Sequence, residues 1–256
     1  MKDDLDNIGK LLLRYIKTII NEYGVYIDSD IINHVLNNKI VTFSNSDTIS
    51  FIVKKGVLYL PKHIYSLIPE FQKNIGYGVL PNDGRRIEDY MDTSTTYYDY
   101  INHFIRGGLS AYNYFEESLL HEAFHLCGCS GNHPLEEGIT ELKTRELAQK
   151  YSIKIAGYAY PKEVEVAKKV QDIMGKDIID ELAFVLDNKY DFLIGKVGIE
   201  KADLYLKVVK DMTDLSKGYY SKFEKISKPS DKAELYSQLD YSSVLKYLDE
   251  YIGKIR

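Results

Sequence analysis

The sequence predicts an α+β protein with a small antiparallel sheet in an N-terminal lobe, a motif-bearing helix in the middle and a helical C-terminal lobe. Short β-branched and aromatic runs around a glycine-containing turn fall within residues 39–60. Elsewhere, apolar residues mostly recur at intervals of three and four. We expect a single unit over residues 1–256, with the N-terminal lobe over 1–130 and the C-terminal lobe over 131–256.

The chain is predicted to begin with two helices. Apolar side chains follow a helical period over residues 4–23, and Gly24 closes that segment. A shorter helix is predicted to start at Ser29 and to continue to about Leu36, because apolar residues again recur at helical spacing.

Three short strands are predicted to follow the second helix. Residues 40–43, 49–53 and 57–60 are rich in β-branched and aromatic side chains. The sequence Lys54-Lys55-Gly56 supplies a turn between the last two runs, and Pro61 ends the third. Together these features predict the small antiparallel sheet.

The remaining chain is predicted to be a long loop followed by helices. Residues 62–73 fit a helix, 74–96 carry strong turn signals and predict a loop, and 97–112 fit either a helix or a strand. From Glu116 onward the pattern is almost continuously helical. Predicted breaks fall at residues 128–134, 153–161, 175, 188–198 and 225–230.

Composition argues against several classes of partner. The chain has 33 basic and 38 acidic residues, and no basic run exceeds a short pair, so we expect no nucleic-acid binding. Arg14 and Lys17 interrupt the first apolar segment, which argues against a signal peptide or a membrane span. Cys127 and Cys129 are too close to crosslink a secreted fold and are predicted to be free, buried thiols. We therefore expect a cytoplasmic protein without a membrane partner.

The motif that carries chemistry is His-Glu-x-x-His at residues 121–125. Positions four apart share a helix face, so His121 and His125 can present their imidazoles to one ion, with Glu122 beside them. Apolar neighbours would bury this helix, and Gly128 offers a C-terminal stop. The simpler alternative is a pair of core histidines whose nitrogens are satisfied by hydrogen bonds.

A second acidic helix is predicted to begin at Pro134, with acids in its first turn. Glu137 and Glu141 are four residues apart and share a face. A catalytic zinc needs a third protein ligand and a carboxylate that orients a histidine. One of these glutamates could therefore bind metal while the other holds an imidazole N–H.

Together these segments resemble the gluzincin branch of zinc metallopeptidases, in which the third ligand is a glutamate on a second helix. The match covers about residues 116–146, including Glu-Glu-Gly-Ile-Thr-Glu at 136–141. Because 11 residues separate His125 from Glu137, fewer than in the thermolysin-like and aminopeptidase groups, the resemblance is to compact gluzincins of low-GC Gram-positive bacteria. Residues 158–165 are similar to a segment that follows the glutamate helix in such proteins. The resemblance implies a zincin-like fold and a zinc peptidase.

The predicted metal ligands are His121, His125 and Glu137, which would hold one Zn²⁺ per chain. We favour Glu137 because the glycine after it allows a close approach of helices. Glu141 is then predicted to orient a histidine from the outer layer of the site. Glu136 as the third ligand, with Glu137 serving the helix start, is the alternative.

Glu122 is the predicted general base, which takes a proton from the attacking water and passes it to the leaving amine. Tyr158 and Tyr160 follow the glutamate helix, and Tyr160 is our choice as donor to the oxyanion. The competing metzincin pattern would use His133, but position 131, where that pattern places a ligand, is glycine. We therefore interpret His133 as a loop histidine near the site.

The predicted function is zinc-dependent hydrolysis of a peptide or protein substrate by a single catalytic unit, with the metal in a cleft between the lobes. One alternative is a zincin-like binding or regulatory module without turnover, which would be expected to carry a damaged motif, whereas Glu122 is intact. Another is an interaction protein in which the motif arose by chance. That protein would bind no zinc.

Overall fold

The computed structural model describes residues 2–43, 51–60, 111–155, 159–219, 222 and 235–255. The predictions for residues 62–73, 74–96, 225–230 and Tyr158 lie outside them, and of 97–112 only the last two residues are described. In chain order the elements are α1 (Lys2–Tyr23), α2 (Ser29–Asn37), β1 (Val41–Phe43), β2 (Ile52–Lys54), β3 (Val57–Leu60), α5 (Ala111–Leu126), α6 (Pro134–Lys150), α7 (Pro161–Met174), α8 (Lys176–Ala183), α9 (Lys189–Val197), α10 (Ile199–Leu215) and α13 (Ser242–Ile255).

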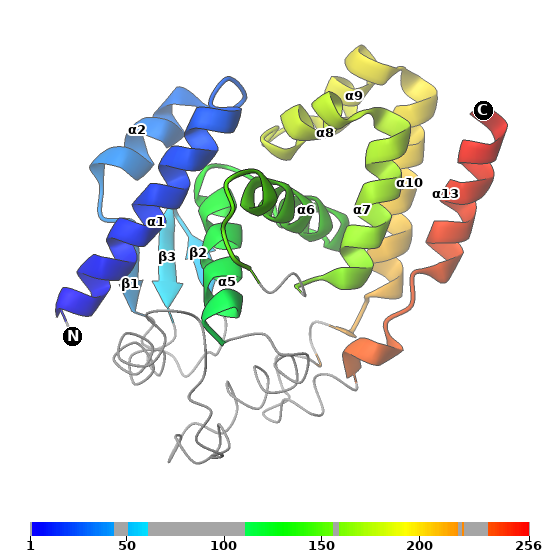
Figure 1. The fold of residues 1–256 in the computed structure, drawn as a ribbon. Helices are drawn as coiled ribbons and strands as arrows, with labels where there is room; N and C mark the ends of the chain where they lie inside the picture. Colours follow the sequence, from blue (N-terminus) through cyan, green and yellow to red (C-terminus); the bar gives the residue numbers. More distant parts are fainter. Residues whose placement is uncertain are drawn as a thin grey trace.

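The first two helices are confirmed close to their predicted bounds. One stripe of α1 is buried against the rest of the molecule and consists of Ile8, Leu12, Tyr15, Ile16, Ile19 and Tyr23. The Asp28 side chain caps α2 by accepting a hydrogen bond of 2.7 Å from the Asp30 N–H. In Figure 1 these helices and the sheet lie on one side of α5.

The three strands are present, but the sheet is mixed rather than antiparallel. Strand β3 lies in the middle, antiparallel to β2 and parallel to β1. Lys55 and Gly56 have φ of 53° and 70°, as a tight hairpin between β2 and β3 requires. Consecutive strands do alternate in direction, but β3 inserts beside β1 and so meets a strand of its own direction. Its Leu58 and Leu60 are fully buried, which suits the central position.

Helix α5 is the middle element, as predicted, and packs on α1, β2 and β3 on one side and on α6 on the other. It ends where Gly128 was expected to stop it. Gly128 has φ of 95°, and its N–H donates to the His125 carbonyl at 3.0 Å. The Cys129 N–H donates to the Phe124 carbonyl at 2.9 Å, which completes a Schellman ending.

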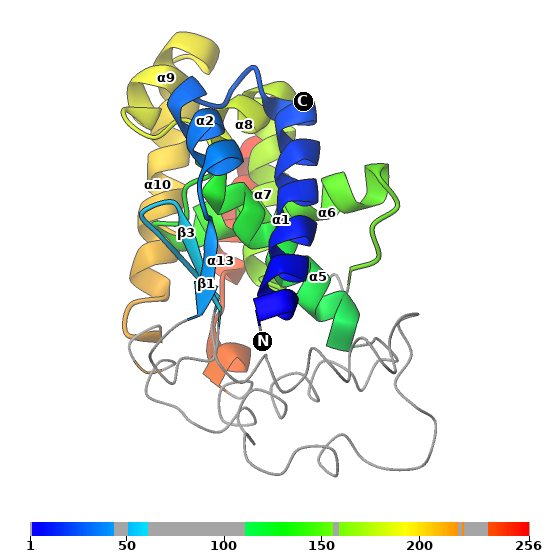
Figure 2. The same ribbon diagram turned by 90° about the vertical axis from the view of Figure 1, so that its left-hand side faces the viewer.

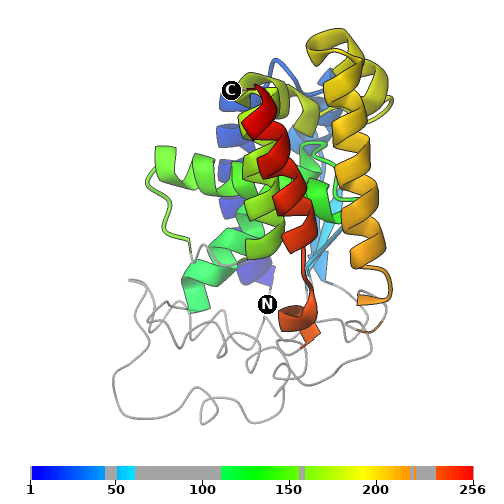
Figure 3. The same cartoon turned by 90° about the vertical axis from the view of Figure 1, so that its right-hand side faces the viewer.

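The C-terminal half is helical, and Figures 2 and 3 show its helices from opposite sides. Helices α6 and α7 approach closely at Gly138, where an added Cβ would lie 2.5 Å from the Glu163 carbonyl oxygen. The predicted break at 188–198 is wrong, because Asn188 and Gly198, at φ of 54° and 85°, bound the helix α9. The true break is at residues 184–188.

The buried apolar residues form one cluster drawn from both halves of the described chain. Cys127 and Cys129 belong to it and are free thiols, as predicted. Within the described residues, no helix combines the length and apolar character that a membrane crossing would require.

Candidate metal centre

Three side chains from two helices converge on one point. His121 and His125 lie on the same face of α5, and Glu137 lies in the first turn of α6. The two imidazole Nε2 atoms are 3.1 Å apart. The Oε2 atom of Glu137 is 3.1 Å from His121 Nε2 and 3.5 Å from His125 Nε2.

The spacing of these donor atoms fits a small tetrahedral metal ion. Zinc bound to nitrogen and oxygen at about 2.0 Å in a tetrahedral arrangement separates its donors by about 3.3 Å. The observed separations of 3.1, 3.1 and 3.5 Å bracket that value. Two imidazoles and one carboxylate are also a donor set that zinc prefers. The residues present therefore fit one zinc ion.

Gly131 leaves the room that this convergence needs. A Cβ at this position would lie 2.5 Å from Glu137 Oε1 and 2.7 Å from the Cε1 atom of His125. Both distances are far below a normal van der Waals contact. Any side chain at position 131 would therefore force Glu137, His125 or the loop itself to move.

The outer nitrogens of both imidazoles are held by acceptors. His125 Nδ1 lies 2.8 Å from the Cys129 carbonyl oxygen, and because a carbonyl can only accept, this Nδ1 carries a proton. In the neutral ring the Nε2 lone pair then faces the convergence point. His121 Nδ1 lies 3.1 Å from Glu141 Oε2, so Glu141 stands where the sequence placed an orienting carboxylate.

Electrostatics favour a cation at the convergence point. Burial opposes charge on His121, yet the carboxylates of Glu137 and Glu141 outweigh it and raise the pKa of His121 well above its usual range. Burial likewise opposes ionisation of Glu137, but the two histidines hold its pKa down at about 2. The site is therefore built to keep a carboxylate charged and to place positive charge beside it.

Glu122 follows His121 on α5 and is half-buried. Burial raises the pKa of its carboxyl group, although His125 and His121 oppose that rise. Its position on the motif helix is the one that the sequence implied for a base next to the metal ligands.

Glu136 belongs to a different cluster. Its Oε2 accepts from Ser130 Oγ at 2.6 Å and from the Asn132 N–H at 2.9 Å, and its Oε1 lies 2.5 Å from Lys189 Nζ. His133 caps α6, since its Nδ1 accepts from the Glu136 N–H at 3.3 Å. Both residues therefore fix the loop before α6, and neither is in the convergent group.

Tyr160 lies against the site. Its ring stacks on the imidazole of His121, with centroids 5.4 Å apart and planes inclined by 20°. Tyr160 is also the N-cap of α7, in a left-handed conformation with φ of 47°. The sequence predicted this tyrosine near the candidate metal group, but its stacking on His121 has no signature in the sequence.

The described part of the chain thus contains a candidate metal-binding group, His121, His125 and Glu137. No protein-family model, curated protein or solved structure matches the chain. The donor geometry and the motif are therefore the observations that indicate its chemistry.

Sequence reasoning missed three contributors to the site. Arg145 donates from Nε to Glu141 Oε1 at 2.8 Å, and its place four residues after Glu141 was a detectable signal. The positions of Gly131 and of the Cys129 carbonyl depend on the backbone conformation of the loop after α5. Nothing in the local sequence pattern predicts that conformation.

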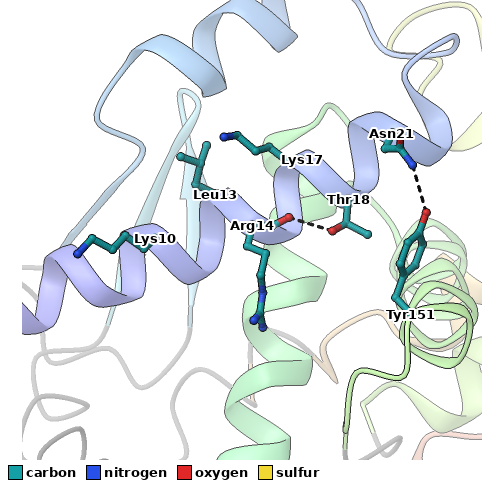
Figure 4. Close-up of a pocket in the computed structure, with 7 residues that line it drawn as sticks. All are labelled: Lys10, Leu13, Arg14, Lys17, Thr18, Asn21 and Tyr151. Atoms are coloured by element: carbon teal, nitrogen blue, oxygen red, sulfur yellow. Dashed lines mark hydrogen bonds between the residues drawn. The ribbon is translucent and has the colours of Figure 1, made fainter.

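A depression of about 500 Å³ lies between the outward face of α1 and Tyr151, away from the metal group. Figure 4 shows Tyr151 at the end of α6, bonded to Asn21, with Thr18 and Arg14 farther along α1. This depression shares no residue with the metal group. Its lining residues are Lys10, Leu13, Arg14, Lys17, Thr18, Asn21 and Tyr151.

Replacing Arg145 by methionine is expected to weaken zinc binding by about 10- to 100-fold, the usual effect of losing an outer partner of a metal ligand. The reason is that Glu141, which is fully buried, would lose the guanidinium that fixes its carboxylate against His121. Competition with a chromogenic chelator measures this change. Lys168→Met, at an exposed position on α7, is the matched control. Unaltered affinity in Arg145→Met would show that Glu141 needs no such support.

Proposed function

We propose that this chain is a zinc-dependent peptidase of the gluzincin type, with one zinc ion held by His121, His125 and Glu137. The observation that carries the proposal is the convergence of two Nε2 atoms and one carboxylate oxygen at separations of 3.1 to 3.5 Å. The donor types support zinc over a harder cation, because two of the three donors are imidazoles.

When bound, zinc would supply Lewis acidity, which lowers the pKa of a water molecule and polarises the scissile carbonyl. Glu122 takes the proton from the attacking water and delivers it to the leaving amine. The Tyr160 hydroxyl is our candidate donor to the oxyanion that develops on the carbonyl oxygen. Glu141 and the Cys129 carbonyl hold the two histidines in the orientation that ligation needs.

The zincin-like character of the fold is part of the same proposal. The motif helix α5 lies between a sheet-bearing part and a helical part, and it meets the glutamate helix α6 at the metal group. This arrangement supports the assignment. The substrate class, a peptide or protein, is what the resemblance to zinc metallopeptidases implies, and the cytoplasmic location stays a prediction of the sequence.

Replacing Glu122 by glutamine is expected to leave zinc content near one ion per chain and to lower peptide turnover by about 10²- to 10⁴-fold, the range that a general base contributes. Glutamine keeps the size of the side chain but cannot accept the proton. Turnover is measured on a mixture of quenched fluorogenic peptides, beside elemental analysis of the same samples. Glu165→Gln, at an exposed position on α7, is the control.

Two results would count against this mechanism. Wild-type turnover by Glu122→Gln would remove the general base from the scheme. A wild-type protein that binds zinc tightly but cleaves none of the peptides would favour the alternative, a zincin-like binding or regulatory module.

A further inference from the structure

The peptide group of Ala159 is held on both sides by charged side chains. Its N–H donates to Glu117 Oε1 at 3.0 Å, and its carbonyl accepts from Arg145 Nη2 at 2.5 Å. Glu117 is fully buried on α5, one turn before His121. Arg145 comes from α6, one turn after Glu141. The two helices that carry the metal group therefore also fix this one residue of the following segment.

The residue after Ala159 is in an unfavourable backbone conformation. Tyr160 has φ of 47° and ψ of 46°, a left-handed geometry that residues with a side chain rarely adopt. Pro161 follows it directly and restricts it further. Strained residues of this kind persist where surrounding contacts determine them, and they cluster at functional sites. The two bonds to Ala159 are such contacts.

The left-handed conformation of Tyr160 determines where its ring lies. The left-handed turn directs the Tyr160 ring onto the face of His121, 5.4 Å between centroids. Glu141 holds the edge of the same imidazole through Nδ1. Arg145 links these two contacts, because it donates hydrogen bonds to Glu141 Oε1 and to the Ala159 carbonyl. Glu141 thus holds the edge of the His121 ring and Tyr160 covers its face, and Arg145 connects the two.

We propose that Glu117 and Arg145 are positioning residues that hold Ala159 so that the Tyr160 ring fixes the plane of His121 for metal binding. This inference rests on the proposed zinc site, but it assigns Tyr160 a role of its ring, separate from any role of its hydroxyl. It also explains why a tyrosine occupies a position where glycine would be free of strain.

The decisive variant is Tyr160→Gly, which removes the ring and relieves the backbone strain together. Its apo form is expected to unfold at a lower temperature than the wild type, because the strain that glycine relieves offsets only part of the packing lost with the ring, which lies against the core. Zinc affinity is therefore compared at a temperature at which both apo forms are folded. The zinc dissociation constant of Tyr160→Gly is expected to rise by about tenfold or more, the lower bound for the loss of a residue that orients a ligand. Tyr160→Phe keeps the ring and is expected to bind zinc as the wild type does.

Asn188→Gly is the matched control, since Asn188 has φ of 54° at the start of α9 and is not part of the metal group. It should change neither zinc affinity nor the fold. A double-mutant cycle then tests whether Glu117 acts through Tyr160. Glu117→Ala is expected to weaken zinc binding, Glu117→Gln to preserve it, and Glu117→Ala with Tyr160→Gly to be no weaker than the more affected single variant.

All affinities are measured with zinc alone, by chelator competition on the full chain. Wild-type affinity in Tyr160→Gly would overturn the positioning role while leaving the metal site intact. Independent losses that add in the double variant would also overturn it, because Glu117 would then act by another route. A wild-type chain that binds no zinc would instead overturn the proposed function, and the positioning role with it.

Discussion

Replacing Glu137 by alanine is expected to abolish stoichiometric zinc binding, whereas replacing Glu136 by alanine is expected to preserve it. Glu137 Oε2 lies 3.1 Å from His121 Nε2 and completes the donor set. Without it, two histidines remain, which is fewer protein ligands than zinc sites use. Glu136 has its partners in Ser130 and Lys189, so its loss would cost stability rather than metal.

Two measurements check this pair. Elemental analysis should give about one zinc per chain for the wild type and Glu136→Ala, and none for Glu137→Ala. At a free zinc concentration 100 times the dissociation constant, binding should stabilise the wild-type fold by about 2.7 kcal/mol, a gain that a chelator removes. Glu137→Ala should show no such gain. If Glu137→Ala retained zinc and Glu136→Ala lost it, Glu136 would be the third ligand and Glu137 would not.

Replacing Gly131 by alanine is expected to reduce zinc affinity by about 100-fold without removing any ligand, an effect at the upper end for changes outside the ligands themselves. The added methyl group would meet Glu137 Oε1 at 2.5 Å and His125 Cε1 at 2.7 Å. A carboxylate can rotate away, but the imidazole ring is held by the Cys129 carbonyl and has less freedom. Either displacement separates the donors.

Gly195→Ala is the control for this substitution. Gly195 lies inside α9, and a Cβ there would meet nothing within 4 Å. Alanine at an interior helix position is expected to stabilise the fold by about 0.5–1 kcal/mol relative to glycine and to leave zinc affinity unchanged. Isothermal titration of both variants with zinc compares them directly. Equal affinities would show that the loop after α5 yields to the methyl group.

The sequence predicted the parts of the site that depend on helical periodicity. A spacing of four residues brings His121 and His125 to one face, and the same spacing relates Glu137 to Glu141. It favoured Glu137 over Glu136 only through the glycine at position 138, because the two neighbouring helix positions are both acidic and differ in the direction of their side chains. That direction depends on how α6 is placed against α5, which is a tertiary property.

The sheet and the Tyr160 contact show the same limit. Short runs of β-branched and aromatic residues predicted the three strands, but the insertion of β3 beside β1 is a matter of strand order, which local patterns do not encode. The left-handed conformation of Tyr160 likewise has no local signature. The bonds beside it join Ala159 to Glu117 and Arg145, which lie 42 and 14 residues away in the chain.

Fraying of the C-terminal end of α5 would change the orientation of the His125 imidazole. Cys129 closes the last turn through its N–H and holds His125 through its carbonyl, so one residue serves both tasks. Helix ends ordinarily open and close on their own with little consequence. Here each opening would release the imidazole and allow it to rotate. A cation bound by His125 would therefore stabilise the last turn of α5. Local order at this helix end would increase with occupancy of the site and decrease when the cation leaves.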